Sequence, residues 1–170
     1  MWRAITAAAV MVMILGTAPP RAASAPGFRF GVDVTATVPF LEWQQSSGVG
    51  IGLLAYGAFT ALPVVDLTVR AGYIGGFQHG PKSMQHLPLL LGVKAYPVRA
   101  LGLYAAVEAG PVWNGRTVSG EAQGFKTEWG ATGGVGFTFG PVDGRVAAFL
   151  PDLVHADEMI GLMLTMGYRW

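Results

Sequence analysis

The sequence predicts an all-β protein, an eight-stranded antiparallel up-and-down transmembrane β-barrel, and three observations support this prediction. Apolar residues alternate with small or polar ones at a period of two, most clearly over residues 28–40. Hydrophobic residues make up 52% of the chain and charged residues only 12%, yet no apolar stretch after residue 25 approaches the length of a helical span. Large aromatic residues gather at the ends of the expected strands, as they do at membrane interfaces.

Residues 1–25 are expected to be a secretion signal that is removed, which leaves one domain over residues 26–170. Arg3 precedes the apolar run 4–15, which is too short to cross a bilayer, and Ala23-Ser24-Ala25 fits a cleavage site. Removal of this segment changes the formal charge from +1 to −1, since it takes away two arginines and no acid. This balance does not suggest a nucleic-acid partner, and the absence of cysteine excludes disulfides and thiol chemistry.

Eight strands are expected along the domain, and the seventh is the shortest and least regular. Their ranges are 28–40, 49–59, 65–73, 87–96, 103–113, 128–139, 145–150 and 161–170. The connections after the second, fourth and sixth strands are short (61–63, 98–102 and 140–144), whereas the others are longer and more polar. Short turns at one end and longer loops at the other are typical of outer-membrane barrels.

Aromatic side chains are expected in two interface belts. The belt at the long-loop end comprises Phe40, Trp43, Tyr73, Trp113 and Trp129. The belt at the short-turn end comprises Phe28, Phe30, Phe59, Phe137, Phe139, Tyr168 and Trp170. Amphipathic rings in these positions predict an apolar band between them that faces lipid.

The stretch Leu87–Trp113 and the terminal Gly-Tyr-Arg-Trp resemble the small outer-membrane β-barrel domain family, which is OmpA- and OmpX-like. Pro97 and the irregular seventh strand depart from the family pattern. The resemblance implies export to the bacterial outer membrane and contact with its lipids. It also implies recognition of the C-terminal strand by the barrel assembly machinery, and we expect a monomer. The resemblance implies little about activity.

The interior of an eight-stranded barrel is only wide enough for side chains to fill it. The inward charged residues are expected to be Arg29, Asp33, Asp66, Arg70, Lys94, Glu108, Arg145 and Arg169. Buried charges must be paired or hydrated, so one interpretation is a structural ion-pair network. The other is a narrow, low-conductance polar path in which Glu108 exchanges between Arg70, Lys94 and Arg145. Inward glycines such as Gly52 and Gly136 are expected to leave room for water.

Two further classes of protein remain as alternatives. A lipid A-modifying enzyme would place a histidine close to a serine, but His79, His86 and His155 form no His-x-Ser motif with Ser46, Ser47, Ser83 or Ser119. We therefore expect no catalytic residue. His155 lies near Asp152, Asp157 and Glu158, but this spacing matches no ligand pattern, so neither metal nor cofactor is expected. A soluble periplasmic ligand-binding barrel would instead turn its apolar face inward.

Overall fold

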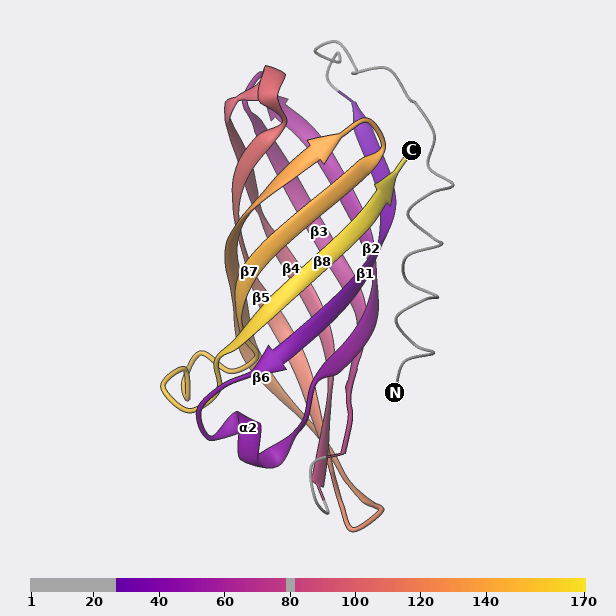
Figure 1. Cartoon of the computed structure of the whole chain (residues 1–170), viewed down its shortest axis with the longest axis vertical. Helices are drawn as coiled ribbons and strands as arrows, with labels where there is room; N and C mark the ends of the chain where they lie inside the picture. Colours follow the sequence, from indigo (N-terminus) through magenta and orange to yellow (C-terminus); the bar gives the residue numbers. More distant parts are fainter. Residues whose placement is uncertain (1–26, 79–81) are drawn as a thin grey trace, which may run out of the picture.

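A computed structural model describes residues 27–78 and 82–170 as a closed barrel of antiparallel strands (Figure 1). Each strand pairs with the next, and the last pairs with the first. The strands are β1 (Phe28–Pro39), β2 (Gly50–Leu62), β3 (Val65–Gly76), β4 (Lys82–Val98), β5 (Leu103–Val118), β6 (Glu121–Phe139), β7 (Val142–Leu150) and β8 (Gly161–Arg169). The predicted eight-stranded up-and-down barrel is confirmed. The predicted signal segment and His79 lie outside the described residues.

Two short helical elements accompany the strands. Helix α2 (Trp43–Ser46) lies in the β1–β2 connection at the long-loop end, and the 3-10 helix η1 (Arg99–Leu101) forms part of the β4–β5 turn (Figure 1). Within the described ranges, no helix has the length and apolar character needed to cross a membrane.

The barrel turns its apolar face outward and its polar face inward. In β1, for example, Val34 is 49% exposed while the neighbouring Asp33 is fully buried. The same alternation continues along β8, where Leu164, Met166 and Tyr168 are exposed. A soluble ligand-binding barrel would have the opposite arrangement, so the exposed apolar wall fits a lipid environment.

The barrel closes where the first and last strands meet. Val34 of β1 lies opposite Met166 of β8, and backbone hydrogen bonds join Phe30 and Trp170 in both directions. Around this seam the rings of Phe28 and Phe59 pack with centroids 5.1 Å apart, and those of Tyr168 and Trp170 lie 6.2 Å apart. Closure satisfies the backbone groups that a terminal strand would otherwise expose.

Strands β4, β5 and β6 are longer than predicted, because much of two expected loops continues the sheet beyond the barrel rim. The β5–β6 hairpin extends to Ser119 and Gly120, whose positive φ angles of 52° and 86° form a tight turn (Figure 1). The outer part of β6 lacks β7 as a neighbour, since their pairing begins at Ala131. Both faces of this extension meet solvent, so its sequence has no apolar alternation from which a strand could be predicted.

Strand β7 is also longer than predicted, because it begins at Val142 rather than at residue 145. Only Gly140 and Pro141 separate it from β6, and Gly140 takes a positive φ of 56°. The Gly-Pro-Val-Asp-Gly composition resembles a longer turn, which explains the misplaced boundary. As a consequence, Asp143 belongs to a strand and points into the barrel, where it is fully buried.

Candidate functional site: the barrel interior

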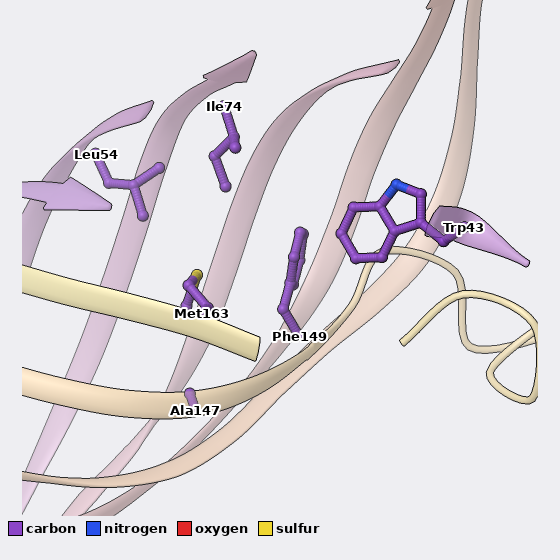
Figure 2. Close-up of a cluster of buried hydrophobic side chains, with 6 residues drawn as sticks. All are labelled: Trp43, Leu54, Ile74, Ala147, Phe149 and Met163. Atoms are coloured by element: carbon purple, nitrogen blue, oxygen red, sulfur yellow. The ribbon is translucent and has the colours of Figure 1, made fainter. Parts of the chain in front are cut away.

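Two groups of side chains fill the interior. Toward the short-turn end lies the charge network, which we define as Asp33, Arg70, Lys94, Glu108, Asp143, Arg145 and Arg169. Toward the long-loop end lies the apolar plug, which we define as Trp43, Leu54, Ile74, Ala147, Phe149 and Met163 (Figure 2). The eight charged residues predicted to face inward all have interior ion-pair partners.

Glu108 is the central acid of the charge network. Its carboxylate lies 2.6 Å from Nη1 of Arg145 and 3.4 Å from Nε of Arg70. The hydroxyl groups of Thr68 and Thr132 each donate a hydrogen bond of 3.1 Å to the same carboxylate. Both carboxylate oxygens of Glu108 therefore have partners, which offsets the free energy lost when the charge leaves water.

Arg169 joins two further acids to this centre. Its guanidinium lies 2.5 Å from Asp33 and 3.3 Å from Asp143, and Asp33 also lies 3.2 Å from Arg70. Asp143 in turn pairs with Lys94 and accepts a 2.8 Å hydrogen bond from the Tyr104 hydroxyl. Lys94 is thus bound by Asp143 and not by Glu108, the partner considered from the sequence. Asp143 was missed because its position was assigned to a turn.

Aromatic rings balance the excess of cations, since the charge network has four cations and three carboxylates. The Arg169 guanidinium lies 3.8 Å from the ring centroid of Tyr56, and the Lys94 ammonium lies 3.6 Å from that of Tyr104. The face of an aromatic ring attracts a cation, most strongly where water is excluded. These tyrosines therefore stabilise charge that the carboxylates leave uncompensated.

A smaller ion cluster closes the short-turn end. Asp66 is fully buried and pairs with both Arg29 and Arg99, the second at 2.9 Å. Arg99 also donates a hydrogen bond to the Pro63 carbonyl of the neighbouring turn. Sequence reasoning missed Arg99 because it lies in the β4–β5 turn, outside the inward face of any strand. The cluster joins β1 and β3 to two turns at this end of the barrel.

Trp43 occupies the long-loop end of the lumen, contrary to the prediction that it lies in an interface belt. Its side chain is only 3% exposed, and its ring packs edge-on against that of Phe149, with the centroids 6.0 Å apart (Figure 2). The ring also packs edge-on against His86, with the centroids 5.3 Å apart. Helix α2 turns back over the barrel mouth and directs the indole inward. The sequence showed only that Trp43 lies next to a strand end, which does not determine whether its side chain points into the lumen or toward lipid. The remaining belt aromatics lie on the outer surface.

A polar chain runs beside the apolar plug. His86 Nδ1 lies 2.6 Å from Oδ1 of Asn114, and the Asn114 amide donates to Glu128 at 2.5 Å and to the Pro151 carbonyl at 3.1 Å. In the loop that follows β7, His155 instead pairs with Asp152 at 2.5 Å. Across the two described ranges, no serine or threonine hydroxyl hydrogen-bonds to a histidine, and no cluster of metal-ligating side chains forms.

The inward glycines give space to neighbouring side chains, and the expectation that they leave room for water is wrong. A Cβ atom at Gly52 would lie 2.8 Å from the Ile74 side chain. A Cβ atom at Gly136 would lie 2.4 Å from the ring of Tyr104. Each glycine therefore allows a large residue on the adjacent strand to lie across it, and the lumen is filled more completely.

The closed ring, the apolar wall and the ion pairs inside it define the architecture of a small transmembrane β-barrel. Solved structures share this fold. Neisserial surface protein A superposes with a TM-score of 0.58 at 12% identity, covering 86% of this chain and 98% of that one. Ail, the attachment invasion locus protein of Yersinia pestis, superposes with a TM-score of 0.57 at 14% identity, covering 86% of this chain and 100% of Ail.

A de novo designed transmembrane β-barrel also matches, with a TM-score of 0.53 at 16% identity over 88% of this chain and 100% of the design. No protein-family model and no curated protein matches the sequence. The predicted likeness to small eight-stranded outer-membrane barrels is confirmed at the level of the fold.

Proposed function

We propose that this protein is a monomeric outer-membrane barrel with a structural role, a lumen closed to solutes at rest, and extracellular loops available for partner contact. The observation that carries this proposal is the position of Trp43, whose side chain fills the long-loop end of the lumen. The low-conductance pore considered from the sequence is the less favoured form of the same function.

Two successive barriers support a closed lumen. A solute that enters from the loops first meets the apolar plug, whose close contacts must be lost before water can pass. It then meets the charge network, in which Asp33 of β1 shares Arg70 with Glu108 of β5 and shares Arg169 with Asp143 of β7. Opening that second barrier would leave buried charges without partners, at a cost of about 3–5 kcal/mol for each broken pair.

The outer surface supports the proposed location. Apolar side chains such as Leu91 and Val107 face outward between the aromatic belts, and lipid tails would cover them. With the short turns in the periplasm and the long loops outside, β8 would present its apolar face to the barrel assembly machinery and to outer-membrane lipids.

A lipid A-modifying activity receives less support. His155 and Asp152 form a pair at the long-loop end, and they could serve as a base and its orienting acid. However, within the described residues neither is hydrogen-bonded to a hydroxyl nucleophile. Lipid A mass spectrometry of cells with and without the protein tests this alternative, and an altered acylation pattern would revive it.

Conductance in planar bilayers tests the proposal directly. We expect almost no single-channel conductance from the wild type and a measurable increase for Trp43→Ala, because the substitution removes the indole that closes the lumen. Trp113→Ala is the matched control, since Trp113 is partly exposed on the outer wall and should leave conductance unchanged. A wild-type conductance equal to that of Trp43→Ala would contradict the closed lumen.

A further inference from the structure

Three methionines lie in or against the apolar plug at the long-loop end. Met163 of β8 belongs to the apolar plug and is 1% exposed, while Met84 of β4 and Met159 of the β7–β8 loop are half-buried and pack against the plug. The described part of the chain has one further methionine, Met166, which is 50% exposed on the outer wall. The thioethers are therefore concentrated around one structural feature.

Met84 and Met159 lie on the outer side of the plug. Met84 precedes the plug-contacting His86 by two residues in β4, and it lies opposite Arg116 in the strand extension beyond the rim. Met159 lies in a loop whose backbone meets α2, since the Trp43 N–H donates to the Glu158 carbonyl at 3.1 Å. A water-soluble reagent outside the barrel would reach these two sulfur atoms before it reached Met163.

Packing is the main interaction that keeps the Trp43 side chain in the lumen. Its Nε1 is buried without a hydrogen-bond partner among the described residues, which makes the seated position less favourable. Methionine adapts its shape to irregular gaps and makes favourable sulfur–aromatic contacts. Any change that makes the thioethers of the plug polar would weaken the apolar packing of which the indole is a part.

We propose that Met84 and Met159 are oxidation sites through which a peroxide in the external medium releases Trp43 from the lumen. A sulfur lone pair attacks one peroxide oxygen, and an S–O bond forms as the O–O bond breaks. The proton of the attacked oxygen passes to the second oxygen, which leaves as water. The thioether loses two electrons and the peroxide gains them. The resulting sulfoxide is polar and chiral, so it no longer fits the apolar surroundings of the plug.

This inference rests on the proposed closed lumen for its effect on conductance, but not for the oxidation itself. Peptide mass spectrometry of the full chain in lipid vesicles, sampled during treatment with hydrogen peroxide, measures the order of oxidation. We expect Met84 and Met159 to oxidise several-fold faster than Met163, which is buried, and Met166, which lipid covers. Equal rates at all four positions would overturn the proposal.

Release of the indole is measured by fluorescence, in a variant that keeps Trp43 alone through W2F, W113F, W129F and W170F. Peroxide should shift its emission to longer wavelength, and methionine sulfoxide reductases should restore it. The same variant with M84L and M159L added should not respond, because leucine conserves volume but resists oxidation. M166L is the control substitution, and it should leave the response intact.

Conductance separates the two proposals. Peroxide should increase the conductance of the wild type several-fold and leave that of M84L/M159L unchanged, provided that heat-modifiable gel mobility shows both to be folded. If the untreated wild type already conducts, the closed lumen is wrong, and the emission of Trp43 still decides the oxidation proposal. Oxidation of both methionines without any change in Trp43 emission would overturn it.

Discussion

The charge network and the apolar plug fill the same lumen but are held in different ways. Every member of the charge network lies on a strand of the barrel wall, and each ion pair joins strands that cannot separate without breaking the sheet. Five of the six plug residues also lie on strands, but Trp43, at the mouth of the lumen, is carried by a four-residue helix in a connection. If the lumen is closed as proposed, we expect the network to contribute mainly to stability and the plug mainly to permeability.

The largest expected effect comes from Glu108→Ala, which would leave Arg145 and Arg70 without their shared acid. We expect the free energy of unfolding to fall by about 3–5 kcal/mol, measured by urea titration in lipid vesicles. If the plug alone closes the lumen, single-channel conductance stays at the wild-type value. Increased conductance would instead support the polar path through Glu108 and break the division between the two regions.

Trp43→Ala makes the complementary change and should affect stability less than Glu108→Ala. The β1–β2 connection can leave the lumen while the strands stay folded. Loss of the indole should therefore lower the free energy of global unfolding only slightly. The same urea titration measures this difference. A drop in stability as large as that of Glu108→Ala would show that the plug and the barrel wall unfold as one unit.

Gly136→Ala sharpens the comparison by changing the space around the charge network while leaving its charges unchanged. The added Cβ would meet the Gly144 carbonyl oxygen of β7 and the ring of Tyr104, which contacts Lys94 and donates to Asp143. Displacement of this ring and of the neighbouring β7 backbone should destabilise the barrel by about 1–3 kcal/mol. Gly133→Ala on the same strand is the control, because its Cβ would meet open space.

Arg99→Ala removes one partner of Asp66 at the short-turn end. Arg29 still pairs with this acid, and the Arg99 side chain is partly exposed, so we expect a loss of at most about 1 kcal/mol. Urea titration at low and high salt measures it. A larger loss of unfolding free energy that persists in high salt would show that the Asp66 cluster behaves energetically like the buried charge network.

The smallest expected effect is that of pH on the order of the β7–β8 loop, which contacts Trp43. The hydrogen bond with Asp152 raises the pKa of His155 above its ordinary value of 6.5. Burial opposes ionisation of Asp152, but hydrogen bonds from His155 and the Val154 N–H lower its pKa below the ordinary 3.8.

The stabilisation of the folded loop by protonated His155 is complete below pH 6.5 and is lost as the pH rises through the raised pKa of His155. The stabilisation by ionised Asp152 is lost as the pH falls through the lowered pKa of Asp152. We therefore expect the loop to be best ordered between pH 3.8 and 6.5. Amide exchange of Leu153, whose N–H donates to the Trp129 carbonyl, measures this order. A His155→Gln variant should lose the dependence above pH 6.5.

The sequence by itself determined the class of fold and the two faces of the wall. Alternation is visible in a chain because successive strand side chains point to opposite sides, and a lipid-facing band selects apolar residues at every second position. Positions such as Asp33 and Glu108 could therefore be assigned to the interior from the alternation alone. The outer β5–β6 hairpin could not be predicted, because solvent on both sides imposes no such selection.

Only the tertiary structure decided which interior groups meet. The direction of Trp43 depends on how a connection folds back over the mouth, and the pairing of Lys94 with Asp143 depends on strand register and on where β7 begins. Arg99 reaches Asp66 from a turn, and the space beside glycines such as Gly136 is occupied by side chains from the next strand. These contacts join residues far apart in the chain, so the local pattern at either residue does not specify its partner.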